Sequence, residues 1–172
     1  MAHIHRLLEQ ELSSTLKIHP VVFLNGPRQA GKSTLAQRLM QKGHANHYVS
    51  FDNALQLAAA SYDPESYLSE QKKPLIIDEV QMVPEIFRAI KIAVDEQRLQ
   101  SQTKAKGQFL LTGSANIMAL PKLSDALVGR MGILTLYPLS ATEINKGKGD
   151  FIERLFEADF TPTTKPYKLS HI

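Results

Sequence analysis

The sequence predicts an α/β fold: a central parallel sheet of five strands with helices on both faces. Short apolar segments typical of buried strands alternate along the 172 residues with segments of helical periodicity. The expected strands are spaced by roughly 20 to 40 residues, as in parallel strands that are joined by crossover helices. Polar residues follow several of these strands, and sheets of this type bind ligands at the carboxyl ends of their strands.

The first elements alternate between helix and strand. Residues 4–16 place apolar side chains on one helical face, and His19-Pro20 ends this leading helix before the apolar strand at 21–25. An amphipathic helix is expected to begin near Lys32 and to end at Gly43. The β-favourable residues 47–51 predict the second strand.

The middle of the chain continues the alternation. Residues 53–61 are rich in alanine and leucine and predict a helix. Asp63-Pro64 starts another helix, with the aspartate as its cap and the proline in the first turn. Residues 74–78 form a continuous apolar run that ends in an acid, which is typical of a strand buried on both faces. Pro84 opens a long helix that ends near residue 97.

The last elements complete the sheet. Residues 108–112 form an apolar strand that Gly113 terminates, and residues 132–137 form the fifth strand before a proline. A helix is expected between them at 120–127, and a short amphipathic helix is expected within residues 150–172. We therefore predict one domain over residues 1–145, followed at 146–172 by a short helix and a tail.

A glycine-rich segment joins the first strand to the second helix. Residues 26–33 read Gly-Pro-Arg-Gln-Ala-Gly-Lys-Ser, which is the spacing of a phosphate-binding P-loop in the strand-to-helix context that it requires. Gly26 and Gly31 allow the backbone to turn tightly and to bring its N–H groups close to a β-phosphate. The helix that follows points its positive dipole end at the same anion. A glycine-rich turn that matches this spacing by chance is the alternative.

The side chains after the second glycine complete the expected nucleotide site. Lys32 carries a mobile charge that reaches the β- and γ-phosphates. The Ser33 hydroxyl is a ligand for Mg²⁺, which takes few protein ligands and keeps several waters, while Thr34 is expected at the α-phosphate. Arg28 either contacts phosphate or pairs with a carboxylate. The predicted nucleotide-binding residues are Gly26, Pro27, Arg28, Gln29, Ala30, Gly31, Lys32, Ser33 and Thr34.

Two acids close the third predicted strand. Asp78, at the tip of the strand, is expected to hold Mg²⁺ opposite Ser33, usually through water. Glu79 points in a different direction, where a glutamate can orient or deprotonate a water that attacks the γ-phosphate. The structural alternative is that Asp78 only caps the following turn.

Further candidates follow the fourth strand and precede the fifth. The hydroxyls of Thr112 and Ser114 either hold the attacking water and contact the γ-phosphate, or belong to an ordinary turn around Gly113. Arg130 either neutralises charge in the transition state as an arginine finger or forms a surface salt bridge. These five residues, Glu79, Lys32, Arg130, Ser114 and Thr112, are the predicted catalytic set.

Composition narrows the function classes. The formal net charge is +3 and the basic residues are scattered, so the chain alone gives little support for nucleic-acid binding. It contains no cysteine, which excludes disulfides and thiolate metal sites and suits a reducing cytosol. No apolar run approaches the length of a membrane span, and the first residues do not resemble a signal peptide. We therefore expect a cytoplasmic protein without a membrane partner.

Taken together, these motifs resemble a prokaryotic AAA-type ATPase family whose P-loop reads G-P-R-Q-x-G-K-[ST]-T. The resemblance covers about residues 4–143, and its further matching segments are Phe51-Asp52, Asp63-Pro64, residues 77–84, 111–115, 127–130 and 136–140, with Glu143 just after. It implies an AAA-type P-loop NTPase fold and ATP as the nucleotide. It also implies Asp78 as the acid on the Mg²⁺ side, Glu79 as the catalytic glutamate, a sensor role around Thr112 and Ser114, and Arg130 as the arginine finger.

Members of that family usually continue into a domain that resembles the restriction-endonuclease fold. This chain ends at Ile172, so the resemblance implies an N-terminal part of a longer protein, with residues 146–172 as the start of the further domain. It also implies slow hydrolysis by this part alone. A homo-oligomer in which Arg130 acts on a neighbouring subunit is one expected partner arrangement.

Three functions fit these residues. The first is an Mg²⁺-dependent ATPase that couples nucleotide state to conformational change. The second is a small-molecule P-loop kinase, which is less favoured because such kinases carry several arginines in a lid and this region offers mainly Arg130. The third is a nucleotide-binding switch with little turnover. A GTPase is disfavoured because Gln81 stands where D-x-x-G needs glycine, and because residues 145–148 lack the aspartate of N-K-x-D.

Overall fold

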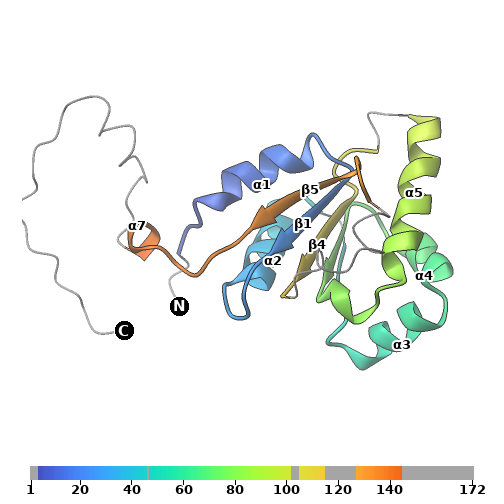
Figure 1. The fold of residues 1–172 in the computed structure, drawn as a ribbon, viewed down its shortest axis with the longest axis horizontal. Helices are drawn as coiled ribbons and strands as arrows, with labels where there is room; N and C mark the ends of the chain where they lie inside the picture. The colour runs from blue at the N-terminus through green and yellow to red at the C-terminus, as the bar shows by residue number, and fades with distance from the viewer. Residues whose placement is uncertain (1–3, 46, 102–104, 115–126, 145–172) are drawn as a thin grey trace, which may run out of the picture.

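In the computed structural model a five-stranded parallel sheet forms the centre of the domain, with strand order β2-β3-β4-β1-β5 (Figure 1). The structure describes residues 4–45, 47–101, 105–114 and 127–144. The strands are β1 (Val21–Asn25), β2 (His47–Ser50), β3 (Leu75–Asp78), β4 (Phe109–Gly113) and β5 (Met131–Thr135). The predicted parallel α/β fold is confirmed, and each strand begins and ends within two residues of its expected limits.

Helices cover both faces of this sheet. On one face lie α1 (Leu8–Leu16) and α2 (Lys32–Gln41), and on the other lie α3 (Ala54–Tyr62), α4 (Pro64–Glu70) and α5 (Ile86–Gln100). A short 3₁₀ helix, η1 (Val80–Met82), follows β3, and α7 (Ala141–Ile144) is the last described element. The sequence did not predict η1 or α7. The helices expected at 120–127 and within 150–172 lie outside the described residues, apart from Leu127.

Side-chain alternation along the central strands divides the core into two layers. In β1, Val22 and Leu24 pack with α1 and α2, whereas Val21 and Phe23 pack with α3, α4 and α5. All four residues of β3 are buried, as expected for a strand that is covered on both faces.

The polar side chains that precede α3 and α4 explain where these helices begin. The Asn53 carboxamide oxygen accepts hydrogen bonds from the backbone N–H groups of Leu55 (3.0 Å) and Gln56 (3.2 Å). The Asp63 carboxylate caps the next helix by accepting from the N–H of Ser66 at 3.1 Å, which confirms its predicted role.

Strand order brings the predicted site residues to one edge of the sheet. Strand β1 lies between β4 and β5, and Asn25 at its end is in register with Gly113 of β4. Strand β3 pairs with the other side of β4. The carboxyl ends of β1, β3 and β4 therefore lie side by side, at the end of the sheet where the P-loop begins.

Candidate nucleotide site

The P-loop turns between β1 and α2 in a conformation that needs its two glycines. Gly26 has φ +150° and Gly31 has φ +93°, and Gly31 directly precedes α2. A Cβ atom at Gly26 would lie 2.2 Å from the carbonyl oxygen of Leu136, so the loop packs directly on the chain that follows β5. The structure agrees with the turn predicted from the motif, and α2 begins at Lys32 as expected.

The lysine of the loop is buried beneath it. Lys32 is 5% exposed, and its ammonium group donates to the carbonyl oxygens of Gly26 (2.9 Å) and Pro27 (2.8 Å). These contacts hold the ammonium against the backbone of the loop. Pro27, Arg28 and Gln29 form the exposed crest of the loop.

The carboxylate of Asp78 joins the P-loop helix to the sheet. Its Oδ1 atom accepts a hydrogen bond from the Ser33 hydroxyl at 3.1 Å and another from the Thr112 hydroxyl of β4. Asp78 is 4% exposed and Thr112 is fully buried. The two residues predicted to hold the metal therefore lie in contact, and Thr112 contacts the acid instead of projecting freely from the end of its strand.

Tyr48 of β2 is a site residue that the sequence reasoning missed. Its hydroxyl donates to Oδ2 of Asp78 at 2.7 Å, so both carboxylate oxygens have hydroxyl donors. Burial and the neighbouring Asp78 carboxylate raise the pKa of Tyr48 above its usual value, which keeps the phenol protonated and donating. In the sequence a tyrosine in a short strand has no distinguishing feature, because its partner lies 30 residues away.

Ser33 and Asp78 fit a magnesium ion by the chemistry of their oxygens. Mg²⁺ prefers hard oxygen ligands and is usually held by one or two protein groups together with phosphate oxygens and water. A hydroxyl and a buried carboxylate at one strand end supply that set. No cluster of three or more histidine or acidic side chains suited to a metal occurs in the described part of the chain.

Glu79 adopts a backbone conformation that non-glycine residues rarely adopt. Its φ is +54° and its ψ is +42°, in the left-handed region. The side-chain amide of Gln81 in η1 donates to Oε2 of Glu79. A Cβ atom at Gly113 would lie 2.6 Å from Oε1 of Gln81, so that glycine makes room for the glutamine between the ends of β3 and β4. Gln81 was not among the predicted site residues.

Arg130 lies at the opposite edge of the sheet from the P-loop. Its carbonyl oxygen accepts from the N–H of Val21 at the start of β1, and Gly26 follows five residues later, roughly 16 Å along the strand. Its guanidinium makes two hydrogen bonds to Asp95 of α5, at 2.7 and 3.0 Å. The structure therefore brings Lys32, Ser33, Asp78 and Thr112 together, with Glu79 and the half-buried Ser114 at the same edge, and it separates Arg130 from them.

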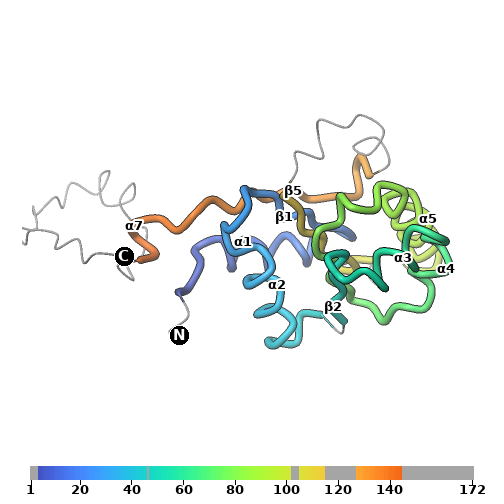
Figure 2. Tube along the Cα trace, turned by 90° about the horizontal axis from the view of Figure 1, so that it is seen from below, coloured from blue at the N-terminus to red at the C-terminus, as the bar shows by residue number. Residues whose placement is uncertain are grey.

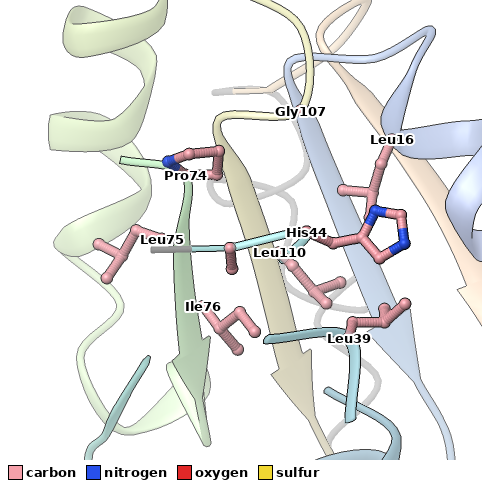
Figure 3. Close-up of a pocket in the computed structure, with 9 residues that line it drawn as sticks. Leu16, Leu39, His44, Pro74, Leu75, Ile76, Gly107 and Leu110 are labelled. Atoms are coloured by element: carbon pink, nitrogen blue, oxygen red, sulfur yellow. The ribbon is translucent and has the colours of Figure 1, made fainter. Parts of the chain in front are cut away.

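A small pocket occupies the other end of the sheet. Figure 3 shows its lining residues around the amino ends of β3 and β4, including Pro74, Gly107 and Leu110. The pocket is mostly apolar and scarcely larger than a water molecule, so it offers no room for a nucleotide.

A buried ion pair lies next to the P-loop. Nε of Arg6 donates to Oε1 of Glu143 at 2.9 Å, and both side chains are less than 10% exposed. Burial alone would raise the pKa of Glu143, but hydrogen bonds from the N–H of Ser140, from Arg6 and from the N–H of Leu7 outweigh it and hold the pKa at about 2. The sequence reasoning did not predict this pair.

The sequence matches a known protein family. A family model described as an AAA domain matches residues 18–145. Uncharacterized proteins of Mycobacterium bovis and Mycobacterium tuberculosis are each 32% identical to the chain over 131 residues. The match covers 76% of this chain and 28% of the length of each relative.

Solved structures share the fold at low sequence identity. The Walker-type ATPase of Pyrococcus abyssi aligns with a TM-score of 0.54 and 16% identity, over 91% of this chain and 59% of that protein. A DNA replication initiation factor aligns with a TM-score of 0.50 and 16% identity, over 91% of this chain and 50% of that one. Among the described residues, no helix is both long enough and apolar enough to cross a bilayer.

The low pKa of Glu143 predicts how replacing this residue changes acid stability. Because the folded pKa lies below the ordinary 4.5, the ion pair stabilises the fold at higher pH, and this contribution disappears as the pH falls from 4.5 to about 2. Glu143→Gln should lower the free energy of unfolding by about 3 kcal/mol near pH 7, and by progressively less below about pH 4.5. Urea unfolding across this pH range measures the difference.

The matched control for that experiment is Glu11→Gln, an equivalent change at an exposed position of α1. The control should leave stability nearly unchanged at every pH. A constant difference between wild type and Glu143→Gln down to about pH 2.5 would contradict a charged, hydrogen-bonded Glu143.

Proposed function

This chain belongs to the AAA domain family, and from that premise we propose that it binds ATP with Mg²⁺ at the P-loop and hydrolyses it. The observation that carries the proposal is the 3.1 Å hydrogen bond from Ser33 to Asp78. It brings the hydroxyl at the start of the P-loop helix and the acid at the end of β3 to one point. We further propose that the domain converts the state of its nucleotide into conformational change.

Backbone and lysine bind the phosphates in this proposal. The N–H groups of the loop and the first turn of α2 face the β-phosphate, where the helix dipole also favours an anion. Lys32 exchanges one or both of its loop carbonyl acceptors for phosphate oxygens. The predicted contacts of Arg28 and Thr34 with phosphate belong to the same proposal.

Ser33 and Asp78 are the proposed holders of Mg²⁺, Ser33 directly and Asp78 through water. A bound Mg²⁺ would neutralise negative charge on the phosphate oxygens, and Ser33 and Asp78 would hold it there. Tyr48 and Thr112 orient the Asp78 carboxylate by donating to its two oxygens. They act through Asp78 and not on the nucleotide.

Glu79 is the proposed base that activates the attacking water. A carboxylate that accepts a hydrogen bond from an attacking water polarises that water and takes its proton. In the structure one oxygen of Glu79 accepts from Gln81 instead. Ser114, at the same edge, remains the candidate that contacts the γ-phosphate or the water.

A role for Arg130 requires a second copy of the chain. Since Arg130 lies at the far edge of the sheet, its proposed contact is with the nucleotide of a neighbouring subunit in a homo-oligomer. Asp95 holds the guanidinium in place at the surface, and the hydrogen bond from Arg130 lowers the pKa of Asp95, which keeps it charged.

A second candidate function is a nucleotide-binding switch with little turnover. The hydrogen bond from Gln81 to Glu79 favours it, because this bond occupies one of the two carboxylate oxygens that could accept from an attacking water. The two functions share the same bound nucleotide and differ only in the release of phosphate.

Removing the ammonium of Lys32 tests nucleotide binding directly. We expect Lys32→Ala to weaken the affinity for Mg²⁺–ATP by about a hundredfold or more, because a charge-assisted contact with the phosphates is lost in a buried setting. Isothermal titration calorimetry measures the affinity. Lys17→Ala, the same change at an exposed position beyond the end of α1, is the control and should bind as wild type does. Equal affinities for both variants would refute the proposed P-loop contact.

The two candidate functions separate on Glu79. We expect Glu79→Gln to keep ATP bound and to reduce the rate of phosphate release by about a hundredfold or more, the contribution typical of a general base. The exposed Glu96→Gln on α5 should hydrolyse ATP at the wild-type rate. No phosphate release by the wild type, with ATP bound, would support the switch. Release at equal rates by wild type and Glu79→Gln would remove Glu79 from the chemistry.

The Tyr48 hydroxyl should affect the metal more than the nucleotide. Tyr48→Phe removes one donor from Asp78, and such supporting contacts typically change metal affinity by about tenfold or more. We expect a higher Mg²⁺ concentration at half-maximal binding of ATP in titrations, with little change in metal-free ATP affinity. Tyr67→Phe removes an equivalent hydroxyl, bonded to Gln56, on the other face of the sheet and is the control. Identical Mg²⁺ dependence in the two variants would show that Tyr48 only packs.

A further inference from the structure

Arg6 connects the P-loop to two later segments of the chain. Its Nη1 atom donates to the carbonyl oxygen of Ala30 in the loop, and its Nη2 atom donates to that of Tyr137, each at 2.6 Å. Its Nε atom donates to Glu143 at 2.9 Å. Arg6 is only 6% exposed, so these bonds are shielded from water. One guanidinium group thus reaches the loop, the segment after β5 and the last described helix.

Glu143 holds this guanidinium from α7. Oε1 of Glu143 also accepts from the N–H of Leu7, and Oε2 accepts from the N–H and the hydroxyl of Ser140, at distances of 2.9 to 3.1 Å. The carboxylate therefore joins the start of α7 to the residues that lead into α1. Figures 1 and 2 show α7 near the amino end of α1, at the opposite end of the described structure from α4 and α5.

The two glycines of the P-loop pack against Arg6 and against the chain after β5. A Cβ atom at Gly31 would lie 3.3 Å from Nη1 of Arg6, and one at Gly26 would lie 2.2 Å from the carbonyl oxygen of Leu136. Both ends of the loop are thus in close contact with Arg6 or with the chain that leads from β5 to α7. A side chain has no room at Gly26 and little room at Gly31, so the loop backbone packs closely on Arg6 and on the chain after β5.

We infer that Arg6, held by Glu143, positions the P-loop and carries a change in its conformation to α7. This inference rests on the proposed binding of ATP. Lys32 donates to the carbonyl oxygens of Gly26 and Pro27 in the loop, and a bound phosphate group would compete for the same ammonium. Nucleotide binding would therefore change the hydrogen bonds of the loop, and Ala30 of that loop is bonded to Arg6.

Only an arginine can make this connection. Its planar fork presents donors in three directions at fixed angles, whereas a lysine at the same position offers one compact ammonium on a flexible stem. Arg6→Lys therefore keeps the charge that Glu143 requires but cannot hold Ala30, Tyr137 and Glu143 at once. Arg6 is a positioning residue, because its hydrogen bond in the loop goes to the backbone of Ala30 and not to a phosphate.

The chain offers a clean way to observe α7. It contains no cysteine, and Ile144 at the end of that helix is 44% exposed, so Ile144→Cys accepts a single environment-sensitive fluorophore. Saturating Mg²⁺–ATP is added to the labelled protein and to the labelled Arg6→Lys variant, with occupancy measured independently by calorimetry. We expect a fluorescence change in the first protein that falls by about fivefold or more in the second at equal occupancy.

Arg38→Lys is the matched control. Arg38 on α2 pairs with Glu9 of α1 at 3.6 Å, so this variant weakens an ion pair in the same helical layer. It should retain the full fluorescence change, because it leaves Arg6 and the partners of Arg6 intact. Where Arg6→Lys fails to fold by circular dichroism, Glu143→Gln replaces it and should also lose the change.

Each result decides the inference. An equal fluorescence change in the Arg6→Lys and unsubstituted proteins at full occupancy would overturn it, as would no change in the labelled protein although calorimetry shows binding. No heat of binding in the unsubstituted protein would overturn the proposed ATP site, and with it this connection. A change that disappears in Arg6→Lys and persists in Arg38→Lys supports the inference.

Discussion

The carboxylate of Asp78 is the point on which the rest of the site depends. It accepts hydroxyl donors from Ser33 of α2, Thr112 of β4 and Tyr48 of β2. A buried carboxylate without such donors costs several kcal/mol, so the fold gains stability only when all of these segments are in place. The same hydrogen bonds that satisfy the buried charge therefore fix the start of the P-loop helix relative to the sheet.

A second constraint acts from behind the loop. The backbone of the P-loop touches the chain after β5 at Gly26, where no side chain has room, and it accepts a hydrogen bond from Arg6 at Ala30. The loop is thus held by Asp78 through Ser33 on one side and by Arg6 on the other. A phosphate-binding turn with backbone N–H groups directed inward needs such support, because its own residues contribute few stabilising contacts.

The parts of this structure that the sequence predicted are those with a local signal. Apolar runs located all five strands, and the P-loop spacing placed Lys32 and Ser33 at the start of a helix. Tyr48 and Arg6 were missed, and Glu143 was named only at the end of the family resemblance without a role. The hydrogen bond from Tyr48 to Asp78 and the ion pair between Arg6 and Glu143 join residues at least 30 positions apart, and no local pattern reveals such partners. Arg130 illustrates another limit. Arg130 precedes β5 and therefore lies at the amino end of that strand, whereas the P-loop follows β1 and lies at its carboxyl end. Because β1 and β5 are parallel, the two lie at opposite ends of the sheet.

The two acids at the end of β3 differ in how firmly they are held. Asp78 is buried and has three hydroxyl donors, so any reorientation would break several charge-assisted bonds at once. Glu79 is partly exposed and accepts from a neutral donor, the amide of Gln81. Its backbone occupies a left-handed conformation that itself costs energy. A fixed acid suits a metal that must stay in one place during a reaction. A loosely held acid suits a base whose side chain has to meet a water at the terminal phosphate.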